Sequence, residues 1–298
     1  MAPFPWQREP GQGLTLASSQ EVRNTMSSSA ASQSGVAEVN GAQLNYELAG
    51  AGSPVALLHA GIADSGMWDD QFAHFAVAHQ VLRFDMRGFG QSSMPDEPYS
   101  LSDDLYGLLR QLGIGPAAIV GVSIGGGTAI RFAIEHPEMV TALVPVGAGL
   151  GGFAYTGEGE ESWPQIEATQ KAGDFDRAAG LVVRMWVDGP NRSPDRAPAT
   201  VRDRVRAMER HNMSQPEPEH ARPIPLDPPE ITGLGEIRAP TLVIVGDEDL
   251  ADIQRIADHL AANIPGARKA VMHDTAHVPN MEKPEEFNRL VLDFLRGV

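Results

Sequence analysis

Residues 117–127 read AAIVGVSIGGG, and this stretch decides the fold. The apolar run 117–122 predicts a short buried strand, and the helical pattern after it extends for about three turns to His136-Pro137. Between them lies Gly121-Val122-Ser123-Ile124-Gly125, a G-x-S-x-G pattern. A serine on such a strand-to-helix turn has a strained backbone, and the flanking glycines let neighbouring segments pass without a clash at Cβ. The stretch predicts a nucleophile at Ser123.

The pattern by itself also fits a glycine-rich turn, because the chain contains 31 glycines. Its position between a strand and a helix favours the nucleophile. The helix directs its first amides and the positive end of its dipole at the serine, which favours a developing oxyanion.

Strands and helices alternate on both sides of this stretch. Residues 35–50 alternate apolar and polar side chains around Asn40-Gly41, which predicts a β-hairpin. Further strands are predicted at 55–58, 81–84, 140–146, 241–245 and 267–272, and helices at 101–112, 251–263 and 284–296. The predicted fold class is α/β, a mainly parallel sheet with helices on both faces, whose ligands bind at the carboxyl ends of the strands.

The alternation is interrupted at 151–235, where amphipathic helical pieces precede a proline-rich tail, PEPEHARPIPLDPP. We expect a helical cap insertion and linker there, with the core formed by 35–150 and 236–298. Residues 1–34 are rich in Ser, Gln, Pro and Gly, which predicts a disordered leader. The sequence leaves open whether translation starts at Met1 or Met26.

Composition narrows the class of protein. The formal charge is 23 − 39 = −16, which disfavours nucleic acid and anionic membranes as partners. The partner we expect is a small-molecule substrate. The chain has no cysteine, which excludes disulfides, thiolate metal sites and a cysteine nucleophile. With no secretory signal and no long apolar run, we expect a cytoplasmic protein. The oligomeric state stays open.

A serine needs a base, and the base needs an orienting carboxylate. His277 follows the last predicted strand, so its loop opens at the same sheet edge as Ser123; His273 falls at the strand end. VGDEDL at 245–250 follows the preceding strand, and we choose Asp249 as the acid with Asp247 in reserve, although such acids also cap helices. The predicted catalytic residues are Ser123, Asp249 and His277, with no metal and no cofactor.

The remaining site residues come from two loops and the cap. The amides of Gly61 and Ile124 are the predicted oxyanion donors, and His59 is interpreted as a residue that braces its loop. Large apolar side chains in 151–235 could line a substrate pocket, although at helical spacing they more often pack a helix onto the core. These candidates are Trp163, Met185, Trp186, Met208 and Met213.

Together these segments resemble the α/β-hydrolase superfamily, in particular capped members such as enol-lactonases and the esterase or non-haem peroxidase types. The resemblance rests on His59-Ala60-Gly61, the run 84–92 (FDMRGFGQS), the Ser123 elbow with Gly126-Gly127, the acid loop and Ala276-His277. It implies that Asp85 braces a loop. Ala60 stands where the family usually has glycine, which puts the oxyanion geometry in question.

The resemblance implies a serine hydrolase that cleaves an ester-like bond of a small or medium, fairly apolar substrate through an acyl-enzyme. Serine at the elbow argues against dehalogenase and epoxide hydrolase chemistry, for which similar folds use aspartate. Lactone opening, C–C cleavage and perhydrolysis on the same residues remain open, as does a non-hydrolytic binding or cyclising role.

Overall fold

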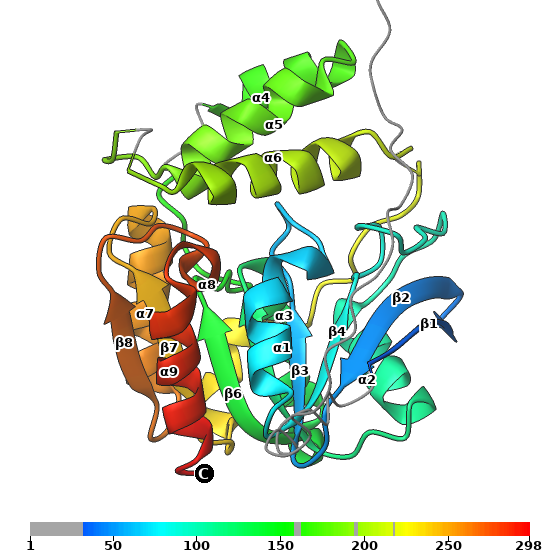
Figure 1. Ribbon diagram of the computed structural model, residues 1–298, viewed down its shortest axis with the longest axis vertical. Coiled ribbons are helices and arrows are strands. Elements are labelled where there is room, and N and C mark those ends of the chain that lie inside the picture. Colours follow the sequence, from blue (N-terminus) through cyan, green and yellow to red (C-terminus); the bar gives the residue numbers. More distant parts are fainter. Residues whose placement is uncertain (1–31, 158–161, 194–195, 217) are drawn as a thin grey trace, which may run out of the picture.

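The computed structural model describes residues 32–157, 162–193, 196–216 and 218–298 (Figure 1). Within them, an eight-stranded sheet has the order β1-β2-β4-β3-β5-β6-β7-β8. β2 pairs antiparallel with β1 and β4, and the remaining neighbours pair in parallel. The strands are β1 (Gln33–Val39), β2 (Ala42–Ala49), β3 (Pro54–Leu58), β4 (Gln80–Phe84), β5 (Ala117–Val122), β6 (Val140–Val146), β7 (Leu242–Gly246) and β8 (Arg268–Met272).

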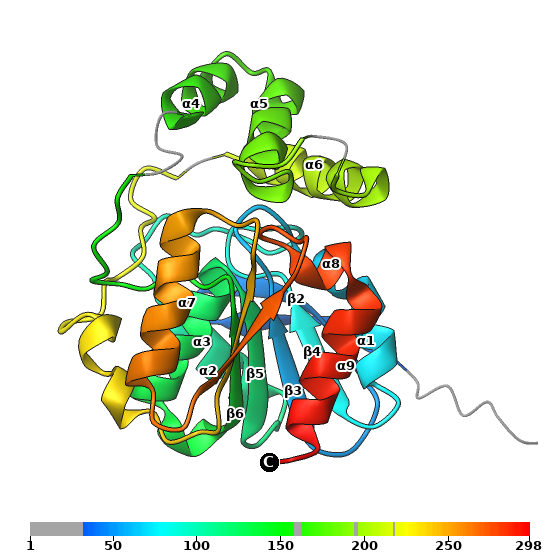
Figure 2. The same cartoon turned by 90° about the vertical axis from the view of Figure 1, so that its left-hand side faces the viewer.

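Helices cover both faces of this sheet (Figure 2). One face packs against α1 (Asp69–Phe75) and α9 (Pro284–Leu295), and the other against α2 (Leu101–Gln111), α3 (Ile124–Glu135) and α7 (Ala251–Asn263). Leu57 and Leu58 on β3 are both fully buried but belong to opposite cores, which is why central strands are continuous apolar runs.

The predicted fold class is therefore confirmed. The strands predicted from 55–58 onward and the helices predicted at 101–112, 251–263 and 284–296 agree with the structure to within one residue at each end. β1 begins at Gln33, which pairs with Leu48, two residues before the predicted start of the core. Residues 1–31 of the predicted leader, including Met26, lie outside the described residues.

Several short elements complete the core. They are η1 (Ser65–Trp68), η2 (Pro137–Met139), η5 (Glu230–Thr232), η6 (Leu234–Glu236) and α8 (Pro279–Glu282). The sequence pattern did not predict α1 or α8, because α1 spans seven residues and α8 four, too few to display a helical period. Within the ranges given above, no helix is both long and apolar enough to cross a bilayer.

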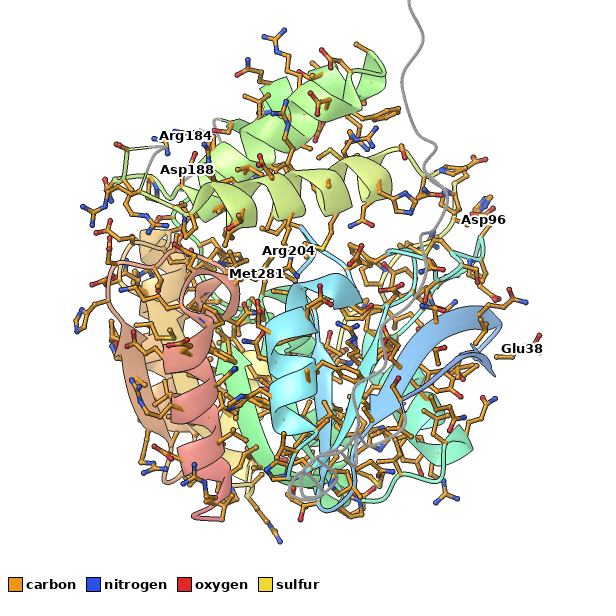
Figure 3. The ribbon with its side chains drawn as sticks, in the orientation of Figure 1. Glu38, Asp96, Arg184, Asp188, Arg204 and Met281 are labelled. Atoms are coloured by element: carbon orange, nitrogen blue, oxygen red, sulfur yellow. The ribbon has the colours of Figure 1, made fainter. Side chains whose placement is uncertain are left out.

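Between β6 and β7 the chain forms a helical layer above the carboxyl ends of the strands (Figures 1 and 2). We call it the cap; it consists of α4 (Trp163–Lys171), α5 (Phe175–Val182), the π-helical turn η4 (Val183–Val187) and α6 (Ala199–Met213). Polar contacts attach α6 to the core. Arg204 donates to the carbonyl of Gly66 at 2.7 Å (Figure 3), and Asn212 donates to the carbonyl of Ala63 at 3.0 Å.

Candidate active site

Ser123 occupies the turn between β5 and α3 in a strained conformation, with φ 57° and ψ −117°. Its amide donates to the Val146 carbonyl at 2.9 Å, and its own carbonyl accepts from the Gly127 amide at 2.9 Å. Both pattern glycines are required by packing: a Cβ at Gly121 would collide with the backbone of Gly125, and a Cβ at Gly125 with the carbonyl of Leu58. The turn therefore has the geometry of a nucleophile elbow.

His277 and Asp249 form a buried pair at the same edge of the sheet. Nδ1 of His277 lies 2.8 Å from Oδ2 of Asp249, and each side chain is 1% exposed. A carboxylate can only accept, so Nδ1 donates its proton and Nε2 keeps its lone pair. The ring is fixed from the cap side as well: the His277 amide donates to the Trp186 carbonyl at 3.2 Å, and the two rings lie 4.2 Å apart.

Asp247, the reserve acid, contacts His273, the other histidine of this loop. Nδ1 of His273 lies 2.8 Å from Oδ2 of Asp247, and the histidine side chain is 83% exposed. The other oxygen of Asp247 accepts from the Asp274 amide at 2.6 Å. Asp247 thus shapes the turn after β8, whereas Asp249 orients His277.

Gly147 connects the serine turn to this pair. It follows β6 directly after Val146, the residue that accepts from the Ser123 amide. A Cβ on Gly147 would lie 3.2 Å from Oδ2 of Asp249 and 3.4 Å from Nδ1 of His277, and φ here is +48°. Gly147 was not among the predicted site residues, because its one signal in the sequence is a glycine immediately after a strand at the carboxyl edge.

The predicted oxyanion donors come from two adjacent segments. Gly61 follows β3, and a Cβ there would lie 3.5 Å from Cγ2 of Ile124. Ile124 is the first residue of α3, so its amide has no acceptor within the helix. The structure thus brings the Gly61 loop against the helix end that begins at Ile124.

His59 and Asp85 brace these loops. Nε2 of His59 accepts from the Met86 amide at 2.9 Å, which places the ring proton on Nδ1, 2.8 Å from the Ala60 carbonyl. Desolvation lowers the pKa of His59, which favours the neutral ring that the hydrogen bond from Met86 requires. Asp85 accepts from the amides of Ser65 and Gln91 at 2.8 and 2.9 Å. Both side chains are engaged in loop geometry.

The structure gathers the three principal cap candidates around one cavity. Trp163, Met185 and Trp186 line a pocket of about 180 Å³ together with Leu250 and Ile253 of the α7 region. Trp186, which lines this pocket, also places its ring 4.2 Å from that of His277. The pocket is therefore next to the candidate base.

Two further cavities lie nearby. A wider cleft of about 920 Å³ between the cap and residues 88–94 is lined by Trp163 and Met213. A third cavity, of about 280 Å³, borders Ile124 and extends along α3 past Thr128. Met208 lies elsewhere, with its sulfur 3.7 Å from the position of a Cβ on Gly66.

Glu209, a buried acid of the cap, has a raised pKa. Burial raises the pKa of Glu209 on α6 to about 7, and a hydrogen bond from Asn212 opposes that rise. Glu209 continues the inward face that Val201 and Val205 form at four-residue spacing. The acid is therefore placed inside the cap, where its ionised form is poorly solvated.

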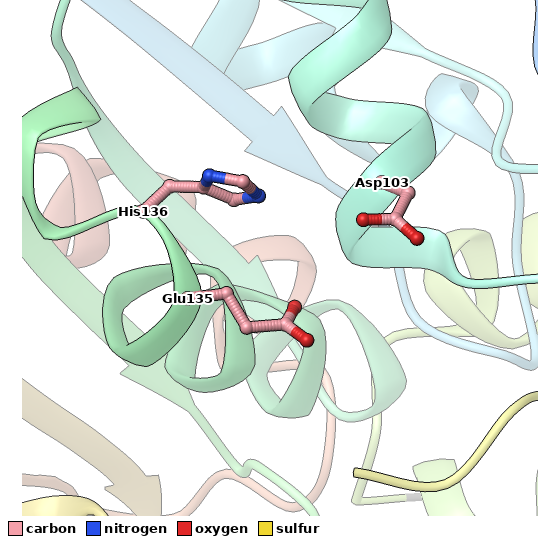
Figure 4. Close-up of side chains that lie close together, drawn as sticks. All are labelled: Asp103, Glu135 and His136. Carbon is pink, nitrogen blue, oxygen red and sulfur yellow. The ribbon is translucent and has the colours of Figure 1, made fainter.

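Asp103, Glu135 and His136 are the group with the spacing of a metal site among the described residues (Figure 4). Arg131 already holds Glu135 through two hydrogen bonds of 3.1 Å, and the His136 ring stacks on Tyr106 at 4.3 Å. A divalent cation there would compete with the guanidinium for Glu135, so we assign no metal to this group.

Comparison with known proteins identifies the family. Residues 53–284 match the family model described as alpha/beta hydrolase fold, and the chain belongs to this family. A 2-hydroxy-6-oxo-6-phenylhexa-2,4-dienoate hydrolase of Comamonas testosteroni is 30% identical over 270 residues, which cover 85% of this chain and 91% of the relative. The superfamily resemblance is thereby confirmed, and the chain is a hydrolase by class.

Two solved structures are also similar. The enol-lactonase from Burkholderia xenovorans LB400 matches with a TM-score of 0.71 and 25% identity, covering 88% of this chain and 100% of that one. Est816, described as an N-acyl homoserine lactone degrading enzyme, matches with a TM-score of 0.69 and 30% identity, covering 87% and 100%.

Proposed function

We propose that the chain is a serine hydrolase that cleaves esters, including cyclic esters, by acyl transfer. Ser123 is the nucleophile, His277 the general base and Asp249 the acid that orients it. The observation that carries the proposal is the buried 2.8 Å contact between His277 and Asp249, which Gly147 joins to the strained turn at Ser123. A protein that merely binds a ligand has no need of this combination.

The proposed cycle has two halves. Nε2 of His277 takes the Ser123 proton as Oγ attacks the carbonyl carbon, and the amides of Gly61 and Ile124 stabilise the oxyanion. The intermediate collapses to an acyl-serine as His277 protonates the leaving alcohol. Water, activated by the same imidazole, then releases the acid. His277 handles every proton transfer, so the scheme calls for no cofactor.

Small or medium, fairly apolar substrates fit the cavities that flank this site. The pocket beside His277 is lined by Trp163, Met185 and Trp186, and that beside Ile124 by Leu101 and Leu150 among others. Large apolar side chains with few polar groups are typical of pockets for such ligands. The lactone-directed descriptions of two structural neighbours support cyclic esters as one substrate class.

A second candidate is hydrolysis of a C–C bond, because the curated relative named above is a dienoate hydrolase. Such a substrate carries a carboxylate, which a cation at the site would bind. The cations that line the three cavities are Arg131 and Lys171, and each already pairs with a glutamate of its own helix. Arg131 binds both oxygens of Glu135 and is therefore less available to a substrate carboxylate, which supports the ester over the dienoate.

The test compares p-nitrophenyl acetate, butyrate and octanoate, an N-acyl homoserine lactone and a 2-hydroxy-6-oxo-dienoate as substrates. We expect ester or lactone turnover by wild type, and a loss of about 1,000-fold or more in Ser123→Ala without unfolding. His273→Ala is the matched control on the same loop and should keep its activity. Near-normal esterase activity in Ser123→Ala would refute the assignment, and turnover of the dienoate alone would favour the second candidate.

A further inference from the structure

Arg192, in the segment that follows η4, is a buried guanidinium with four acceptors. It donates to the carbonyls of Val187, Asp188 and Asp274 at 2.7, 2.9 and 3.1 Å, and to Oε2 of Glu282 at 2.6 Å. The Arg192 and Glu282 side chains are 3% and 2% exposed. One side chain thus joins the end of the cap turn to the loop after β8 and to α8.

Glu282, the carboxylate partner of Arg192, also contacts Ala276, the residue next to the candidate base His277. Its Oε1 accepts from the Ala276 amide at 2.7 Å, directly before His277. Since Arg192 holds the carbonyl of Asp274, the loop is fixed on both sides of residue 275. The segment carrying Arg192 packs closely here, because a Cβ on Gly189 would lie 3.4 Å from that of Ala276.

The same segment also reaches the imidazole. Trp186 belongs to η4; its ring packs against the His277 ring at an angle of 40°, and its carbonyl accepts from the His277 amide. Val187, the next residue, supplies one of the carbonyls that Arg192 binds. Pi-helical turns occur frequently at functional sites, and this one connects the cap to the base.

We propose that Arg192 and Glu282 are positioning residues for His277, which fix the loop that carries the imidazole and fasten it to the cap at Trp186. The inference rests on the proposed function, in which His277 must approach Ser123 closely. A misplacement of about 1 Å in a catalytic group can lower the rate about 100-fold. A pair that fixes this loop therefore acts on the chemical step.

A buried ion pair by itself is weak evidence for a role in stability, because the free energy of desolvating the two charges can equal the gain from their attraction. The bonds of Arg192 go to backbone carbonyls of two separate segments, so its contacts specify where those segments lie. Glu282 likewise accepts a hydrogen bond from a loop amide with its second oxygen. The contacts of both partners therefore fix the positions of backbone segments.

The chain offers a matched control. Arg87 and Asp104 form another buried pair, with a 2.8 Å contact and side chains 1% and 2% exposed. Arg87 also donates to a backbone carbonyl, that of Asn40 in the hairpin, at 2.8 Å. This pair has the same chemistry and burial but attaches α2 to the β1–β2 turn.

The experiment compares wild type, Arg192→Met and Arg87→Met by thermal unfolding, by kcat and KM for p-nitrophenyl butyrate, and by the rate at which a fluorophosphonate labels Ser123. We expect both variants to melt at lower temperature. Arg192→Met should lose about 100-fold in kcat and in labelling rate, with KM changed by about twofold or less. Arg87→Met should keep its kcat and labelling rate.

Glu282→Gln provides a milder variant should Arg192→Met fail to fold. Glutamine keeps an oxygen for the Ala276 amide but cannot accept from Arg192 at its amide nitrogen, so we expect about a tenfold loss in kcat and labelling. Unchanged kcat and labelling in that variant, or an Arg192→Met that behaves like Arg87→Met, would overturn the inference alone. A wild type that is not labelled at Ser123 would refute the proposed function and this inference with it.

Discussion

Glycine at position 123 should make the protein more stable while removing its activity. The backbone there has φ 57° and ψ −117°, which a residue with a Cβ adopts at a cost of about 1–3 kcal/mol. Glycine adopts it freely but adds conformational entropy to the unfolded chain, worth about 0.4–1 kcal/mol. The balance favours Ser123→Gly by roughly 1 kcal/mol, or about 2–4 °C in Tm for a domain of this size.

Ser123→Ala separates backbone strain from the loss of the hydroxyl. Alanine keeps the Cβ and therefore the strain, so its Tm should stay near that of wild type, while both variants lose hydrolysis and fluorophosphonate labelling. Thermal unfolding followed by circular dichroism, with the three proteins in one buffer, measures the difference. A glycine variant that melts at or below the alanine variant would show that the turn stores no strain that glycine relieves.

Two further substitutions test the surroundings of the site. Gly147→Ala places a Cβ 3.2 Å from Asp249 and 3.4 Å from His277, so kcat should fall about 100-fold. Gly113 also has a positive φ, but it has open space around it. Gly113→Ala should therefore lose about 1 kcal/mol of stability and keep its activity. Equal kinetics in the two variants would contradict this account. For Glu209, whose pKa burial raises from 4.5 to about 7, stability falls as pH rises from about 4.5 to 7 because the folded state binds the extra proton. Urea unfolding should show Glu209→Gln gaining roughly 3 kcal/mol over wild type at pH 8 and nothing at pH 4, and a pH-independent difference would refute that pKa.

Elements whose signal is local could be predicted from the sequence. The strand Ala117–Val122 has the predicted bounds because a central parallel strand is buried on both faces and must be apolar throughout. The hairpin turns at Asn40-Gly41 because these residues accept positive φ, here 47° and 78°. In each case one short segment contains the whole reason for its conformation.

The choice between acids within one loop depends on burial in the folded chain and not on the sequence pattern. Asp247 and Asp249 both follow β7, and each contacts a histidine at 2.8 Å. What separates them is burial, since the Asp249 side chain is 1% exposed and that of Asp247 34%. Burial depends on residues that are distant in the sequence, such as Gly147, where a Cβ would lie 3.2 Å from Asp249, and the VGDEDL pattern does not describe them.

Arg192 shows the same limit more strongly. Its partners Asp274 and Glu282 lie 82 and 90 residues further along the chain, so no window of sequence contains the pair. Nothing in the surrounding residues distinguishes this arginine from the many that lie on a surface. Its role follows from the packing of the cap segment onto the loop after β8.

For Trp186 the sequence allowed two roles, lining a substrate pocket or packing a helix onto the core, and in the structure the residue combines them. Its ring is a wall of the 180 Å³ pocket and lies 4.2 Å from the imidazole of His277. A substitution that enlarges the pocket at this wall therefore also removes support from the base, and substrate range and rate change together. Trp163 lines the same pocket and also the 920 Å³ cleft, from α4, whereas the contact with the His277 ring comes from Trp186 on η4. Substrate range can consequently change at Trp163 with less effect on the geometry of the base than at Trp186.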